Sequence, residues 1–177
     1  GMAYMVGFQI WDSFAKRIEG LCRLRTIKQT DQHPIWAEAF REGVMLQFSQ
    51  ELDPEAARDP ANYMMASWEY LRKEEYGSAQ YKADGTPGVD SRLVHSVLLS
   101  EDKKSVFLAI DKMTTTMQLE VQHHLFGNWN QVYFTINELN PSNLSVYGFK
   151  PTNFQKLFDS KPTPRDTTTK QAIVSEV

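Results

Sequence analysis

The chain has a single cysteine among its 177 residues, Cys22. One cysteine excludes an internal disulfide, a four-cysteine zinc site and a Cys-x-x-Cys-His haem attachment within this chain. Because Leu21 and Leu24 lie on either side of the thiol, we expect Cys22 to be buried and chemically inert.

Clusters of one charge and long apolar runs are also absent. The 19 basic and 22 acidic residues give a net charge of −3 and are mixed along the chain without a basic block. Phosphate binding requires clustered lysine and arginine, so nucleic acid is not an expected partner. Apolar runs such as residues 105–110 are far shorter than the ~20 residues that cross a bilayer, and we expect no membrane span.

The N-terminus shows no secretion signal, because it lacks a charged segment, a long apolar core and a small-residue cleavage site. The opening Gly1-Met2 is typical of an expression remnant, which is compatible with a piece of a longer protein. The length favours one domain with a single well-buried core plus appendages.

The stretch from Gly43 to Tyr63 predicts a strand, a capped helical turn and the entry to a second strand. Apolar Val44, Leu46 and Phe48 alternate with Met45, Gln47 and Ser49, so one face is predicted to be apolar and the other to face water. Asp53 is a predicted helix N-cap with Pro54 at the first helical position. A second Asp-Pro pair, Asp59-Pro60, then turns the chain into the next strand.

The remaining pattern predicts further short antiparallel strands. The expected strands are 4–11, 21–28, 36–40, 63–71, 93–99, 105–110, a strand in which Met117, Leu119 and Val121 share the inner face, and a strand in which Val132, Phe134 and Ile136 do so. A polar, Gly-rich connection of unusual length fills residues 72–90. Short strands without a long amphipathic helix predict an all-β, antiparallel sandwich.

The pattern stops at Asn140, where prolines and a Thr- and Ser-rich composition begin. By composition we expect disorder beyond about Ser160. We expect Phe154 and Phe158 to dock on the sandwich or on a neighbouring chain.

Several short motifs occur in a characteristic order along the chain. They are Gly7-Phe8-Gln9-Ile10-Trp11, 21–25, Leu52-Asp53-Pro54, Asp59-Pro60-Ala61-Asn62-Tyr63, Trp68-Glu69-Tyr70, Tyr76-Gly77-Ser78, Tyr81, Leu99-Ser100, Val106-Phe107-Leu108, Met117-Gln118-Leu119 and 135–139. Over roughly residues 3–139 the chain resembles the immunoglobulin-like module that follows the β-propeller in large secreted bacterial proteins related to glucose and sorbosone dehydrogenases, which often also carry c-type cytochrome domains.

The resemblance implies an accessory role. Residues 1–35 would be N-terminal strands left from a preceding propeller, 36–139 the immunoglobulin-like sandwich, and 140–177 an extended tail. Sugar oxidation would belong to the propeller with its quinone, and electron transfer to a haem domain. For this chain the resemblance therefore implies no catalytic residue and no cofactor, an adjacent propeller or cytochrome domain as partner, and a periplasmic or extracellular location.

The four histidines lack metal-ligand spacing, so no metal site is expected. His123 and His124 should point to opposite faces of a strand, one buried or paired and the other solvated, while His95 is expected to be a satisfied core or edge residue and His33 lies in a turn. No Gly-x-Ser-x-Gly elbow singles out a serine nucleophile. Oxygens near Asp84 and Asp90 could serve calcium, but the ordered acidic loop that binds it is missing.

Four aromatic residues are the best candidates for a binding surface: Trp68, Tyr70, Tyr76 and Tyr81. Flat rings anchor protein interfaces and stack on sugars, although alternate members would fill the core instead. The leading hypothesis is a non-catalytic accessory module of a larger secreted or periplasmic sugar-dehydrogenase-like protein, for interdomain packing or protein recognition. The alternatives are a carbohydrate-binding module that uses these rings on a glycan, and a small hydrolase with an unrecognised site.

Overall fold

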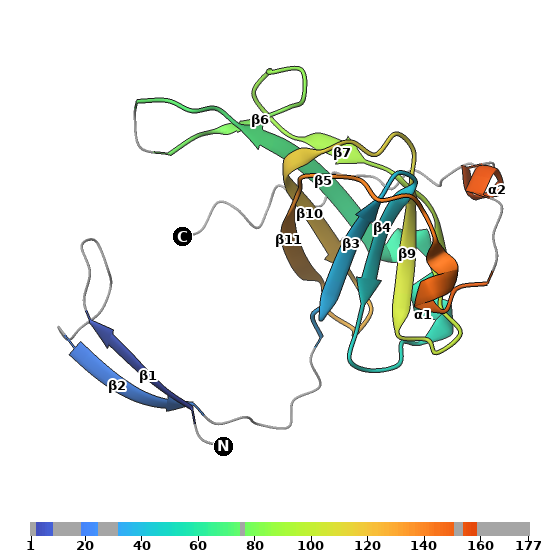
Figure 1. Cartoon of the computed structure of the whole chain (residues 1–177), viewed down its shortest axis with the longest axis horizontal. Coiled ribbons are helices and arrows are strands. Elements are labelled where there is room, and N and C mark those ends of the chain that lie inside the picture. The colour runs from blue at the N-terminus through green and yellow to red at the C-terminus, as the bar shows by residue number, and fades with distance from the viewer. Residues whose placement is uncertain (1–2, 9–18, 25–31, 75–76, 151–153, 159–177) are drawn as a thin grey trace. The chain divides into compact units, whose positions relative to one another are not determined.

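A computed structural model describes residues 3–8, 19–24, 32–74, 77–150 and 154–158 (Figure 1). The chain divides into two compact units, Gly1–Thr30 and Asp31–Val177. The predicted disorder beyond Ser160 lies outside the described residues.

The first unit is a two-stranded antiparallel hairpin. Strand β1 (Ala3–Phe8) pairs with β2 (Glu19–Leu24), with Met5 opposite Cys22 and Val6 opposite Leu21. Both strands were predicted, with longer bounds. The prediction of a buried thiol is wrong, because Cys22 is exposed. The flanking leucines indicate burial only where a second layer covers the strand, and a two-stranded sheet supplies none.

One sheet of the second unit contains four strands in the order β3-β4-β9-β8, all antiparallel. The strands are β3 (Trp36–Phe40), β4 (Gly43–Gln47), β9 (Ser105–Ile110) and β8 (Val94–Leu99). The strands predicted at 36–40 and from Gly43 onward are confirmed, and they pair as a hairpin. Gly43 has a positive φ of 156°, and a Cβ there would lie 2.0 Å from the Leu108 carbonyl oxygen. The hairpin therefore requires glycine at this position.

The other sheet contains five antiparallel strands. Its order is β11-β10-β5-β6, and β7 also pairs with β5. The strands are β11 (Asn130–Ile136), β10 (Thr116–His123), β5 (Tyr63–Tyr70), β6 (Gln80–Tyr81) and β7 (Asp90–Arg92). The short strand β6 lies in the middle of the predicted connection 72–90 and β7 at its end; the sequence pattern predicts neither.

Two short helical turns carry the chain from the first sheet to the second. Helix α1 (Pro54–Arg58) begins at Asp53, whose carboxylate accepts hydrogen bonds from the amides of Glu55 and Ala56 at 3.1 and 2.8 Å. The 3-10 turn η1 (Pro60–Asn62) begins in the same way at Asp59, which accepts from the Ala61 amide at 2.9 Å. The predicted cap at Asp53 is confirmed, and the predicted turn at Asp59-Pro60 takes the form of this capped 3-10 turn. The Tyr63 hydroxyl donates to the Ala57 carbonyl at 2.8 Å and ties α1 to the start of β5.

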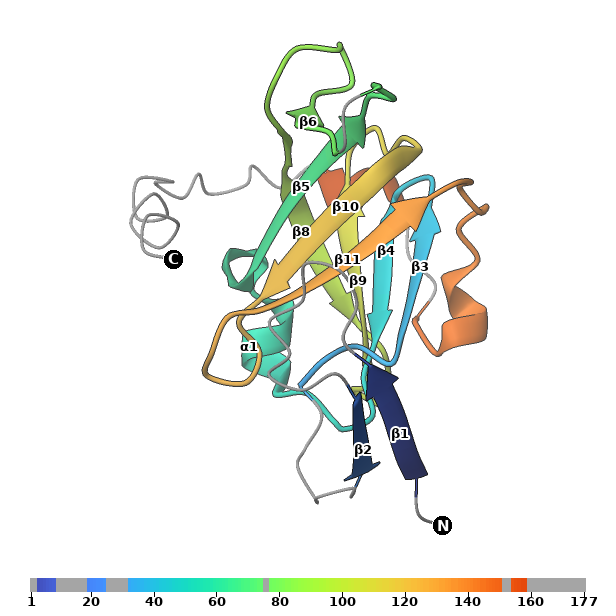
Figure 2. The ribbon, with the colours of Figure 1, turned by 90° about the vertical axis from the view of Figure 1, so that its left-hand side faces the viewer.

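Figure 2 shows the two sheets one in front of the other, and the main core lies between their inner faces. Val44, Leu46, Val106 and Leu108 from the four-stranded sheet are fully buried and share this core with Leu119 and Val121 from the five-stranded sheet. In β11 the alternation of half-buried Val132 and Phe134 with exposed neighbours confirms the predicted inner face. The all-β, antiparallel, sandwich-like fold is therefore as the sequence predicts.

A second core covers the outer face of the four-stranded sheet. The prediction that Met45 faces water is wrong: Met45, Phe40, Phe107 and Ala109 are buried under residues from the C-terminal part of the chain. Two short elements supply that cover, the 3-10 turn η2 (Leu144–Tyr147) and helix α2 (Phe154–Phe158). Leu144, Phe149 and Leu157 are buried in this cluster.

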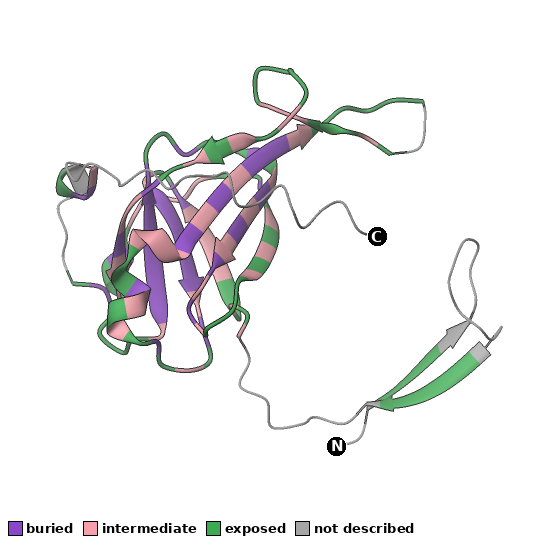
Figure 3. Cartoon of the chain, turned by 180° about the vertical axis from the view of Figure 1, so that it is seen from behind, coloured by how far each residue is buried: buried purple, intermediate pink, exposed green. Residues whose placement is uncertain are grey.

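The expected docking of the C-terminal segment is confirmed for Phe158, which packs against the second cluster and lies with its ring centroid 5.5 Å from that of His95. The side chain of Phe154 lies outside the described residues. Figure 3 shows the resulting difference between the sheets, since β9 is buried along its whole length whereas β11 alternates.

A β-bulge changes the expected facing of β10. The pairing of β10 with β11 shifts register between Thr116 and Leu119. Thr116 is consequently buried, with its hydroxyl 3.1 Å from the Trp68 carbonyl oxygen, and Met117 is 47% exposed. The prediction that Met117 shares the inner face with Leu119 and Val121 is therefore wrong, because the bulge inserts one residue before the alternation resumes.

Candidate functional site

The structure does not gather the predicted aromatic residues into one platform. Register places Trp68 of β5 opposite Gln118 on β10, and Glu69 of β5 opposite Tyr81 on β6. Because side chains alternate along β5, Trp68 and Tyr70 share one face of the sheet, and Tyr81 lies on the other. The half-buried Tyr81 ring is covered by Lys73, whose Nζ is 5.5 Å from the ring centroid. Tyr76 lies outside the described residues.

Trp68 lies below the protein surface rather than on it. Its side chain is 6% exposed, and the Tyr133 ring meets it edge-on with centroids 6.2 Å apart. The indole Nε1 is buried without a hydrogen-bond partner. Trp68 therefore cannot stack on a ligand unless Tyr133 moves.

Three exposed side chains on the strands β5, β10 and β11 form what we name the Trp68 surface: Tyr70, Met117 and Tyr133, at 39%, 47% and 45% exposure. The Met117 sulfur lies 3.2 Å from the Tyr70 amide nitrogen. The Tyr133 hydroxyl is 3.3 Å from a Glu120 carboxylate oxygen, and partial burial together with this carboxylate raises the pKa of Tyr133. The alternation of β11 already placed Tyr133 outward, whereas no sequence signal indicated Met117.

The carboxylates of the long connection build turns. Asp84 accepts from both the amide and the hydroxyl of Thr86, at 2.9 and 2.6 Å, and these bonds lower its pKa. Asp90 accepts from the Ala83 amide at 2.8 Å. In the part of the chain that the structure describes, no group of three or more His, Cys, Asp or Glu side chains could hold a metal ion.

The histidines are dispersed. His123 is fully buried, with the Phe48 and Phe126 rings at centroid distances of 5.3 and 6.0 Å, and neither of its ring nitrogens has a hydrogen-bond partner. Burial lowers its pKa to about 4, with a smaller effect from His33. His124 is half-buried and lies against the Trp129 ring at 5.3 Å.

His123 is buried, as predicted for one member of the pair, whereas His124 follows the end of β10 and is half-buried rather than solvated; His33 is exposed. His95 is half-buried, but its Nδ1 is buried without a partner, so the expectation of a satisfied histidine is wrong for that nitrogen. The neighbouring Phe158 ring packs edge-to-face against the imidazole and provides no strong acceptor.

The β1–β2 hairpin displays apolar side chains on both of its faces. Tyr4, Val6 and Leu21 share one face by register and are 59%, 80% and 70% exposed. Met5, at 57% exposure, lies on the opposite face beside the exposed Cys22. A lone two-stranded hairpin is at best marginally stable in water, so these side chains need a surface to pack against.

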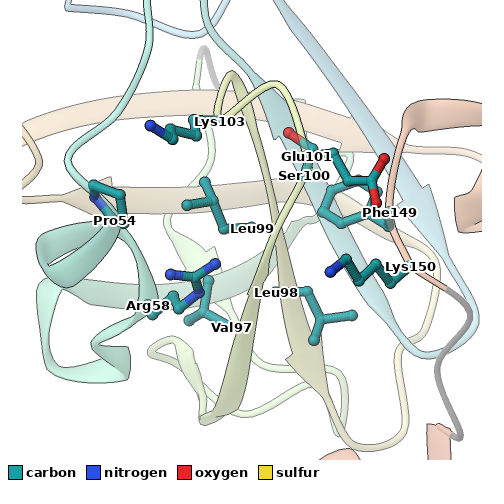
Figure 4. A pocket seen from close by; sticks show the side chains of 10 residues that line it. All are labelled: Pro54, Arg58, Val97, Leu98, Leu99, Ser100, Glu101, Lys103, Phe149 and Lys150. Carbon is teal, nitrogen blue, oxygen red and sulfur yellow. The ribbon is translucent and has the colours of Figure 1, made fainter.

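A groove of about 560 Å³ runs beside strand β8 (Figure 4). Its lining consists of Val97, Leu98, Leu99 and Ser100 with Pro54 and Arg58 on the α1 side, Phe149 and Lys150 on the side of the C-terminal segment, and Glu101 and Lys103 from the β8–β9 turn. Three cationic side chains and one carboxylate therefore border this groove. The contact between Lys103 and Glu51 is 3.9 Å long between two exposed side chains, so it offsets little of this positive charge.

Comparison with protein-family models, with curated proteins and with solved structures finds no match to this chain. Across the described ranges no helix is long and apolar enough to span a membrane.

Proposed function

We propose that this chain is a non-catalytic accessory module, immunoglobulin-like in fold, of a larger secreted or periplasmic sugar-dehydrogenase-like protein. Its role is interdomain packing or protein recognition, with an adjacent propeller or cytochrome domain as the partner that the family resemblance implies. The antiparallel sandwich and the order of motifs along the chain support the immunoglobulin-like assignment.

The observation that carries the proposal is the β1–β2 hairpin. Five neighbouring residues, Tyr4, Met5, Val6, Leu21 and Cys22, are exposed on its two faces. Burying apolar surface gives about 25 cal/mol per Å², so leaving these side chains in water forfeits a large stabilisation. Exposed apolar clusters of this kind mark contact surfaces, and adding the hairpin to another domain would cover them.

Cys22 provides the test, because it is the only cysteine of the chain and lies on this hairpin. The rate of Cys22 modification by a thiol reagent should be high in the isolated 177-residue chain. In the protein encoded by the whole reading frame we expect that rate to fall at least about tenfold, since docking of the hairpin would bury the thiol.

A matched reporter controls for general shielding. In the double variant Cys22→Ser/Asp111→Cys the thiol moves to an exposed turn after β9, and its rate should be nearly the same in both proteins. A reading frame without any further domain, or equal Cys22 rates in the two proteins, would overturn the proposal.

The glycan alternative now rests on the exposed rings of Tyr70 and Tyr133. Affinity electrophoresis through a panel of polysaccharides tests it. Under the leading proposal the migration of the chain is unchanged. Retardation that Tyr133→Ala abolishes, and that Trp36→Ala on the other sheet leaves intact, would favour a carbohydrate-binding module.

A further inference from the structure

Strand β8 is an edge of the four-stranded sheet, since it pairs with β9 on one side and no other described strand pairs with it. Unpaired edges present backbone N–H and C=O groups that another extended segment can bind. Whether β8 can bind such a segment depends on which of its residues point these groups outward and on what surrounds them.

The hydrogen bonds around β9 show which β8 residues point outward. The Ile110 amide donates to the Glu42 carbonyl at 3.0 Å on the β4 side, and the Ser100 amide donates to the Ser105 carbonyl at 2.9 Å on the β8 side. Antiparallel residues alternate between bonding one neighbour and the other. Leu98, opposite Phe107, therefore bonds β9, whereas Val97 and Leu99 direct their N–H and C=O groups away from the sheet.

The same residues line the groove. Figure 4 shows Val97 and Leu99 on the Arg58 side of the strand and Leu98 on the Lys150 side, so the lining follows both sides of β8. The Glu101 amide donates to the Gly148 carbonyl at 2.9 Å, which fixes the end of the groove to the C-terminal segment. An outward-facing strand edge thus lies between two cationic side chains.

We propose that this groove binds an extended peptide segment carrying carboxylate side chains, which pairs with β8 as an additional strand. Main-chain bonds to Val97 and Leu99 supply the pairing, as in other complexes formed by strand addition. Arg58, Lys103 and Lys150 against the single carboxylate of Glu101 select an acidic partner. A second copy of this chain would bring the same cations face to face, so the charge opposes self-association through β8.

This inference goes beyond the proposed function and is separate from it, because the hairpin residues take no part in it. Cys22 modification tests one surface and the experiment below the other, so either proposal can fail alone.

The probe is a synthetic six-residue peptide of alternating glutamate and valine, acetylated and amidated at its ends, added to the complete chain. Amide hydrogen exchange followed by NMR should slow at Val97 and Leu99 by about tenfold or more at saturation, because their amides become bonded. A peptide N-methylated at the alternate residues that would face β8 should not bind, and one with lysine in place of glutamate should bind at least about tenfold more weakly.

Charge reversal sharpens the assignment. Lys150→Glu and Arg58→Glu should each raise the peptide Kd severalfold, while Lys112→Glu, in the exposed turn after β9, should leave it unchanged. Preserved amide spectra confirm that the variants fold. The proposal is overturned by equal binding of the N-methylated or lysine peptides, by an equal effect of Lys112→Glu, or by concentration-dependent protection of Val97 and Leu99 without peptide, which would identify a second copy as the occupant.

Discussion

The two sheets share one interior but differ on their outer faces. Strand β9 of the four-stranded sheet is buried at all six positions, because the C-terminal segment covers its outer side. Strand β11 of the five-stranded sheet keeps alternate residues in water. The difference shows that the sequence of a strand is a continuous apolar run when both of its faces are covered. When only one face is covered, apolar and polar residues alternate.

The largest expected effect compares the two outer faces directly. Phe107→Ala should lower the free energy of unfolding by about 3–5 kcal/mol, because it removes a fully buried ring from beneath Phe40 and leaves a cavity. Tyr133→Ala, on the open face, should cost no more than about 1 kcal/mol. Urea unfolding of both variants measures this. Equal losses would mean that the cover is not formed in solution.

The shared interior should respond to acid through His123. Its folded pKa of about 4 lies below the ordinary value of 6.5, so the unfolded chain binds more protons between these values. Stability should therefore fall as pH drops from about 6.5 to 4, by up to about 3 kcal/mol, and this contribution should level off below pH 4. Denaturation at a series of pH values measures the slope.

His123→Phe should remove most of this slope, whatever its effect on stability at neutral pH. His124→Gln is the matched control and should retain it, because His124 is only half-buried. A wild-type slope that survives His123→Phe would show that another group is responsible.

The connection between the sheets allows a smaller test. Asp53→Ala should destabilise the chain by about 1 kcal/mol, because two α1 amides lose their acceptor. Asp53→Asn, which retains an acceptor oxygen, should recover most of the loss in thermal denaturation. If Asp53→Asn does not recover the stability, the loss comes from the removed charge rather than from the lost cap.

The smallest effect is expected at the bulge. Met117→Ala should change the free energy of unfolding by no more than about 0.5 kcal/mol, because the side chain is half in water. Thr116→Val should cost about 1 kcal/mol through the lost bond to the Trp68 carbonyl. A loss above about 2 kcal/mol for Met117→Ala would mean that Met117 is buried and that the alternation predicted from the sequence is uninterrupted.

Local signals predicted local structure well. The Asp53-Pro54 pair indicated a helix cap and the Asp59-Pro60 pair a turn, since each carboxylate acts within three residues of itself. The inner face of β11 was predictable because it follows from the alternation of side chains within the strand itself. The burial of Met45 was not, because its cover comes from Phe149 and Leu157, about a hundred residues further along the chain.

The candidate surfaces were less predictable than the fold. Tyr70 was one of four candidate surface rings and is exposed, but the exposure of Met117 depends on a bulge that leaves no mark in the residue pattern. The groove beside β8 combines Arg58 with Lys150, and only the folded chain brings these two together. Cys22 was misjudged because its neighbours resemble those of a covered strand.

The cover over β4 and β9 also imposes an order on biosynthesis. The ribosome completes both strands before it makes Leu144 and Phe149, so Met45 and Phe107 are synthesised before the residues that cover them. During that interval the nascent chain exposes this apolar face to water. We therefore expect the face to be prone to aggregation and to bind chaperones until the later segment is made.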